Sequence, residues 1–198
     1  MQRRDFLTLA AAGVTATSLD TNFIRLAMAN DSYALQAGET AIDLGDTGSN
    51  PTNCWLYNGA CPGPMLRRRR GDMLNVTVTN DLPVPTTVHW HGIRNVNEMD
   101  GVPNLTQAPI EPGDNFVYQV PLRDAGTYWY HAHNMGWEQV ARGLYGPLII
   151  DADDDPAVDH DFTLMIDDWR LDKDGQIDAA SFGSLHDWSH GCLLYTSP

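Results

Sequence analysis

The chain has 198 residues, enough for one sizeable hydrophobic core or for one domain with additional arms. Its formal net charge of −14 argues against nucleic acid or an anionic membrane surface as a partner. Beyond the N-terminal region no stretch approaches the ~20 apolar residues of a membrane span, so we expect no transmembrane segment.

The first 29 residues predict an export signal rather than part of the fold. Arg3 and Arg4 precede a small-residue apolar stretch at 9–16, and residues 27–29 (Ala-Met-Ala) provide an A-x-A-like cleavage site. The paired arginines resemble a bacterial twin-arginine signal; a Sec signal or an amphipathic N-terminal helix are the alternatives. We therefore expect a periplasmic or otherwise exported protein.

Residues 30–53, rich in Gly, Asp, Asn and Thr, predict a leader arm with one short strand. Residues 54–168 alternate between β-like segments and Gly- or Pro-containing breaks, which is typical of an all-β sandwich or barrel. The predicted strands are 55–57, 72–80, 86–91, 115–120, 127–133, 144–151 and 162–168. One short helix is predicted at 137–142, ended by Gly143.

The remaining segments predict connections. The long turn-rich loop 92–112 is more often functional than not in a compact domain. Residues 169–191 predict the start of an interdomain connection, and the Asp-Lys-Asp-Gly run at 172–175 predicts a turn rather than a calcium loop. Residues 192–198 resemble the translation of a sequencing adapter, so we expect a non-native tail there.

Three cysteines do not form a disulfide framework. Cys54 and Cys61 are near in sequence and could pair in an oxidising periplasm, but nothing in the sequence fixes their geometry. Neither lies beside a histidine motif, so we do not expect them to be metal ligands.

Two H-x-H motifs carry the strongest chemical signal: His89-Trp90-His91 and His131-Ala132-His133. In a strand, residues two apart point to the same face, with Cα atoms roughly 6.6 Å apart. One such motif would be read as two ordinary strand histidines, whereas two copies in strand-like settings predict a metal site. Neutral imidazoles suit copper, zinc, iron and nickel, and the lack of a neighbouring cysteine or carboxylate favours copper or a catalytic site.

The two motifs resemble the first two copper motifs of the multicopper oxidases, the laccase and bacterial copper-efflux oxidase group. The resemblance runs in order from about Trp55 to Asp168. It is carried by H-W-H-G (89–92), Y-H-A-H (130–133), Y-N-G (57–59), P-G-P (62–64), D-G-V-P (100–103), G-T-Y-W-Y (126–130) and G-L-Y-G-P-L-I-I (143–150).

The resemblance implies a cupredoxin-like Greek-key domain, the first of the parent enzyme. It implies that His89 binds a type 2 copper and that His91, His131 and His133 bind a type 3 pair in a trinuclear cluster that reduces dioxygen to water. Asp100 then matches an outer-sphere acid that assists proton delivery, the alternative being a turn residue before Gly101. Trp90 and Trp129 are expected to pack in the core.

The sequence also departs from the family pattern. The family's other cluster histidines and its mononuclear copper site lie in C-terminal motifs that this sequence lacks. We therefore expect the N-terminal domain of an exported oxidase of phenols, diamines or metal ions, inactive without the missing C-terminal cupredoxin domains. The competing hypothesis is a small periplasmic copper-binding or copper-resistance protein that uses only the four histidines. His160 is expected to be a solvated surface residue, and no role is assigned to His186 or His190.

Overall fold

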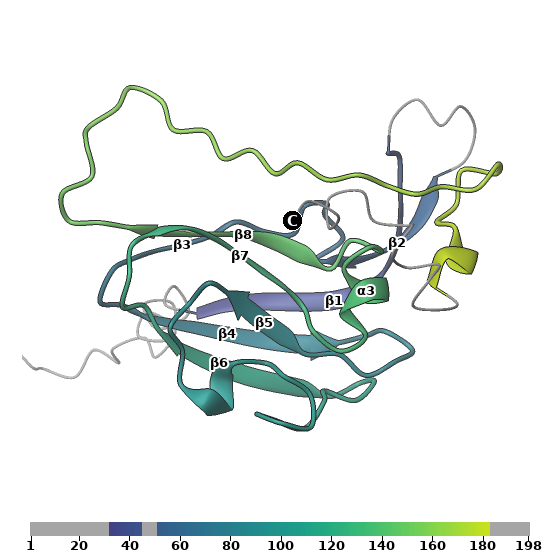
Figure 1. The fold of residues 1–198 in the computed structure, drawn as a ribbon, viewed down its shortest axis with the longest axis horizontal. Helices are drawn as coiled ribbons and strands as arrows, with labels where there is room; N and C mark the ends of the chain where they lie inside the picture. The colour runs from purple at the N-terminus through teal and green to yellow at the C-terminus, as the bar shows by residue number, and fades with distance from the viewer. Residues whose placement is uncertain (1–31, 45–50, 183–198) are drawn as a thin grey trace, which may run out of the picture. The chain divides into compact units, whose positions relative to one another are not determined.

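The computed structural model describes residues 32–44 and 51–182. Within these residues the chain forms two four-stranded sheets, with strand orders β2-β1-β4-β6 and β3-β8-β7-β5 (Figure 1). The strands are β1 (Ser32–Ile42), β2 (Thr52–Tyr57), β3 (Leu66–Arg69), β4 (Met73–Asn80), β5 (Val88–His91), β6 (Asn115–Pro121), β7 (Gly126–Ala132) and β8 (Tyr145–Asp151). The short helical pieces are η1 (Asn97–Met99), α3 (Gly136–Gln139) and η2 (Ala179–Phe182).

The predicted all-β sandwich is confirmed by the way the two sheets share one core. On β4, Leu74, Val76 and Val78 are completely buried and alternate with partly exposed polar residues. They belong to the same buried cluster as Leu148 and Ile150 of β8 in the other sheet. Burying a side chain of this kind stabilises the fold by about 1.5–3 kcal/mol, so the alternation on each strand fixes which face turns inward.

The first sheet contains a strand that is longer than the sequence predicts. A leader arm with one short strand was expected over 30–53, but β1 is eleven residues long. It pairs antiparallel with β2, placing Ala37 opposite Tyr57, and lies between β2 and β4 in the sheet. Leu35 and Ala37 of β1 are buried in the common core, so this stretch is part of the sandwich.

The second sheet positions the histidine motifs. β3 runs parallel to β8, with Leu66 opposite Leu148, and β7 runs antiparallel to β8. β5 pairs only with β7 among the described strands and forms one edge of the sheet. The two H-x-H motifs therefore lie on neighbouring strands.

The chain after β8 differs from expectation. A strand was predicted over 162–168, and that prediction is wrong, because these residues have no strand pairing in the described structure and run as an extended stretch (Figure 1). Phe162, Leu164 and Ile166 are 80%, 85% and 84% exposed. The predicted turn at 172–175 is confirmed: Leu171 and Ile177 form an isolated antiparallel bridge around it.

The predicted helix is shorter than expected. It was placed at 137–142, and α3 covers only Gly136–Gln139, followed by a turn that ends at Gly143, where φ is +112°. The expected signal at 1–29 and tail at 192–198 lie outside the described residues, as do His186 and His190. Of the described helices, none has the length and apolar character needed to cross a membrane.

Candidate metal centre

The register of β5 against β7 brings the two histidine motifs together. His89 lies directly opposite His131, and Val88 lies opposite Ala132. The His133 backbone N–H donates to the Thr87 carbonyl at 3.1 Å, which extends the pairing past the end of β7. Because Trp90 between the first pair is buried in the core, the imidazoles project from the opposite, outer face of the sheet.

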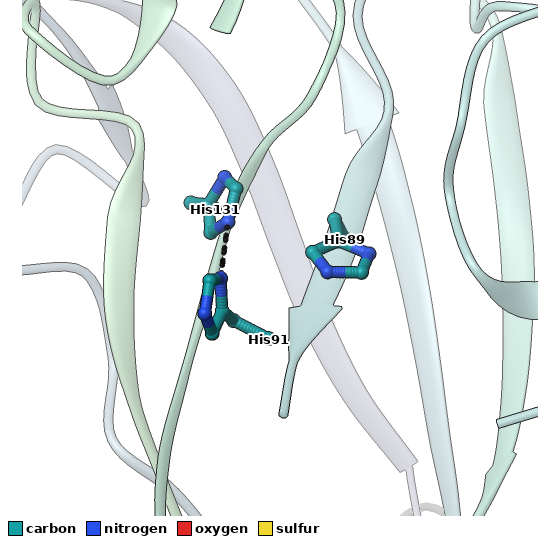
Figure 2. A group of neighbouring side chains, drawn as sticks. All are labelled: His89, His91 and His131. Carbon is teal, nitrogen blue, oxygen red and sulfur yellow. Dashed lines mark hydrogen bonds between the residues drawn. The ribbon is translucent and has the colours of Figure 1, made fainter. Parts of the chain in front are cut away.

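The four predicted histidines form one group of rings. One nitrogen from each of His89, His91 and His131 lies within 4.8 Å of the others, and Nδ1 of His91 is 3.3 Å from Nε2 of His131 (Figure 2). The His133 ring joins this group, with its centroid 5.1 Å from that of His89. The structure thus brings together all four side chains that the sequence singled out.

Backbone carbonyls fix which nitrogen of two rings faces the centre. Nδ1 of His89 lies 2.8 Å from the carbonyl oxygen of Asp100, and Nδ1 of His131 lies 2.9 Å from that of Ala132. A carbonyl oxygen only accepts, so each Nδ1 carries the hydrogen and each Nε2 keeps a lone pair. This is the arrangement by which an outer hydrogen bond orients a metal-ligating histidine.

Burial favours the uncharged form of three of the four imidazoles. The pKa of His131 is lowered from 6.5 to about 4, mainly by burial and also by the neighbouring His89, His91 and His133. The pKa values of His91 and His133 are also lowered, first by burial and then by the other histidines. Neutral imidazole is the form that binds a metal, so these three side chains are in the metal-binding form at neutral pH.

The donor set fits a copper ion. It consists of imidazole nitrogens, and Nδ1 of His133 is a buried polar atom without a hydrogen-bond partner in the described residues. A buried group of this kind is costly unless something binds it, as a metal would. Cys54 and Cys61 are free thiols that lie in a separate buried cluster with Leu56 and Ile177, so the structure places no thiolate in the set.

Asp100 lies against the centre from the loop that follows β5. Besides the backbone contact to His89, its carboxylate Oδ1 is 3.5 Å from Nδ1 of the same ring, and the side chain is 33% exposed. Gly101 makes this approach possible, because a Cβ there would lie 1.8 Å from the Val88 carbonyl oxygen. His160 is exposed, as expected.

Two features of the site were missed from the sequence. Trp129 was expected in the core with Trp90, but it is only partly buried and stacks on the histidines from the outer face. It also lines a cavity of about 330 Å³ that His131, His133 and Trp137 share with residues from the stretch after β8. The alternation along β7 could have predicted this position of Trp129. It lies two residues before His131 and therefore shares the outer face with the histidines, whereas Tyr130 points to the core.

Comparison with known proteins identifies the family. A family model described as multicopper oxidase matches residues 40–155. Copper resistance protein A of Pseudomonas syringae pv. tomato is 40% identical over 162 residues, which are 81% of this chain and 24% of that protein. Copper resistance protein A of Escherichia coli is 43% identical over 139 residues, covering 69% of this chain and 22% of that protein.

Solved structures agree with this assignment. Lac15 from a marine microbial metagenome superposes with a TM-score of 0.68 at 45% identity, covering 73% of this chain and 38% of that chain. A multi-copper oxidase from Pseudomonas thermotolerans gives a TM-score of 0.67 at 38% identity, with 74% and 36% coverage. The chain spans about a quarter of the length of the two curated relatives. With a family model matching more than half of its residues and a cupredoxin-like sandwich that superposes on these structures, the chain belongs to the multicopper oxidase family.

Proposed function

We propose that this chain is the N-terminal copper-binding domain of an exported multicopper oxidase. The parent enzyme would couple one-electron oxidation of phenols, diamines or metal ions to the four-electron reduction of dioxygen to water. In this proposal His89 belongs to the type 2 site, and His91, His131 and His133 belong to the type 3 pair of a trinuclear cluster. Further cupredoxin domains of the parent would supply the remaining ligands.

One observation carries the proposal. The cross-strand register places His89 opposite His131, and nitrogens from both motifs lie within 4.8 Å of one another. The group opens outward, because His91 is exposed while its neighbours are partly or largely buried. A half-open set of imidazoles supports the idea that additional ligands from outside this chain close the site.

The chain's own residues would hold and orient the metal. Copper, when bound, would supply the electron transfer and the reduction of dioxygen. The Asp100 and Ala132 carbonyls hold the His89 and His131 rings with Nε2 directed to the centre, and burial keeps His131 neutral by lowering its pKa. The Asp100 carboxylate, partly exposed and 3.5 Å from His89, is suited to pass protons from solvent toward the site.

The proposal is tested on the purified 198-residue chain and on its genomic context. We expect no oxygen consumption by this chain with a phenolic substrate, and downstream H-x-x-H-x-H and H-C-H motifs in the gene. Turnover of the phenol by the isolated chain would refute the half-cluster assignment. In the parent enzyme, Asp100→Asn should lower turnover and change its pH profile, whereas an unchanged profile would leave Asp100 as a turn residue.

The geometry also supports a second candidate, a small periplasmic copper-binding or copper-resistance protein. Three ligand nitrogens within 4.8 Å could hold one copper ion without help from another domain. This function requires tight, stoichiometric copper binding by the isolated chain, and weak binding would exclude it. Both candidates rest on export, which the predicted twin-arginine signal supports.

A further inference from the structure

Trp129 occupies an unusual place on β7. Its neighbours Tyr130 and Ala132 are completely buried in the core, whereas Trp129 lies on the outer face and lines the cavity beside His131 and His133. It is two residues before His131 on the same strand and directly opposite His91 on β5. It therefore faces both histidine motifs at once.

The indole contacts one imidazole from each motif. Its ring centroid lies 4.2 Å from that of His131 with 29° between the planes, and 5.0 Å from that of His91 with 32° between them. The contact with His131 is stacked and the contact with His91 is tilted, whereas His89 meets His91 edge-on. Pairs of aromatic rings in such geometry attract each other beyond the area they bury.

The two contacts act on the atoms that would meet a metal. The His91 and His131 planes lie at 32° and 29° to the indole, and Nδ1 of His91 faces Nε2 of His131 at 3.3 Å. His91 is exposed, and the one hydrogen-bond contact of its ring in the described structure is this approach to His131. Of the ring contacts of His91, the one with the indole has the shortest centroid distance, 5.0 Å, so the indole restrains its ring plane. Without that restraint, binding a metal would first have to immobilise the ring.

We propose that Trp129 is a positioning residue that presets the ring planes of His91 and His131 for copper. The inference rests on the proposed copper-binding function and assigns a role to a side chain outside the ligand set. A packing role alone would be served by any apolar side chain of similar size. A positioning role requires a flat aromatic surface at this position.

Three variants separate these roles. Trp129→Leu removes the aromatic surface, and Trp129→Phe keeps a smaller one. Trp137→Leu is the matched control, because Trp137 lines the same cavity, is 49% exposed, and has no ring contact with a histidine within the described residues. Cu(II) affinity is measured by competition with a chelator, together with the Cu(II) EPR spectrum. Ring NMR signals of the histidines are recorded without metal.

We expect Trp129→Leu to weaken Cu(II) binding roughly tenfold and to alter the EPR spectrum. Trp129→Phe should recover most of both properties, and Trp137→Leu should match the wild type. In the metal-free chain, only the Trp129 variants should shift the His91 and His131 ring signals, with the larger shift in Trp129→Leu. Because these NMR signals are recorded without metal, they test the positioning role even if the wild type binds no copper. A lack of copper binding by the wild type would contradict the proposed function and not the positioning role.

The inference is overturned if Trp129→Leu leaves affinity, EPR spectrum and histidine ring signals as in the wild type. It is also overturned if Trp129→Phe behaves like Trp129→Leu, or if Trp137→Leu weakens binding equally. Thermal unfolding of each metal-free variant shows whether the fold is intact. If Trp129→Leu fails to fold, Trp129→Met takes its place, because it is also a large apolar side chain without an aromatic surface.

Discussion

Gly101 controls how closely the loop after β5 approaches the histidines. Its φ of +78° lies in the left-handed region, and a Cβ there would lie 1.8 Å from the Val88 carbonyl oxygen. No side chain fits in that space without moving the backbone of β5 or of the loop. The contact between the Asp100 carbonyl and the His89 ring depends on this fit.

Replacing Gly101 by Ala should therefore destabilise the chain by about 3 kcal/mol or more, measured by urea unfolding. Gly113→Ala is the matched control, because Gly113 has a similar φ of +85° but nothing within 4 Å of the added Cβ. It should cost only the backbone strain, about 1–2 kcal/mol. Equal losses in the two variants would show that the loop tolerates a displacement at Gly101.

The buried histidine makes the metal-free chain sensitive to acid. The pKa of His131 is about 4 when folded, below its ordinary value of 6.5, so between these values the unfolded chain binds a proton that the folded chain does not. The free energy of unfolding should fall as the pH drops from 6.5 toward 4, by up to about 1.4 kcal/mol per pH unit, and should not depend on this group above 6.5. Urea unfolding at several pH values measures it. His131→Gln should reduce the slope of the free energy of unfolding against pH. An unchanged slope would show that another group causes the loss of stability in acid.

For single residues, the sequence predicts which side chains share a face of the sheet, but not how the aromatic rings contact one another. The alternation of His89-Trp90-His91 is enough to place Trp90 in the core and the histidines outside. The contact of Trp129 with His91 needs the cross-strand register, which is set by the packing of the whole sheet. The carbonyl contact from Asp100 also depends on the path of a long loop, which no local pattern encodes.

Two elements show the limits of strand prediction. β1 is long because it lies between two partner strands, although the segment 30–53 that contains it is rich in Gly, Asp, Asn and Thr. Residues 162–168 alternate as a strand would but have no partner strand in the described structure. Polar contacts join this part of the chain to the sandwich: Arg67 binds the preceding Asp161 at 2.7 Å, and Tyr145 donates to Asp167. Strand propensity expresses a fit to a pleated partner surface, so the partner decides the outcome.

The exposed apolar residues of this extended stretch should make the isolated chain self-associate. Phe162, Leu164 and Ile166 are all at least 80% exposed, and an unpaired stretch with apolar side chains is a template for association. Replacing all three by Ser should reduce association in light scattering and change the free energy of unfolding by no more than about 0.5 kcal/mol each.

Leu148→Ala serves as the control for that experiment. Leu148 is completely buried in the core, and its truncation should cost about 2–5 kcal/mol without reducing association. If the triple Ser variant lost as much stability as Leu148→Ala, the stretch would have to be packed in solution.

At the scale of the whole molecule, the sequence predicts the sandwich well because its core strands alternate clearly. β4 to β8 correspond to predicted segments, and the core residues of β4 follow from their pattern. The matched parts of the chain cover 24% and 22% of two curated relatives, which are therefore more than three times as long as this chain.

The central claim is that the four histidines of the two motifs are copper ligands. It is tested most directly by X-ray absorption and copper titration of the 198-residue chain and of its His91→Ala/His131→Ala double variant. We expect copper coordinated by imidazole nitrogens in the wild type, and loss of that coordination in the double variant. The same copper content and the same imidazole coordination in both proteins would contradict it.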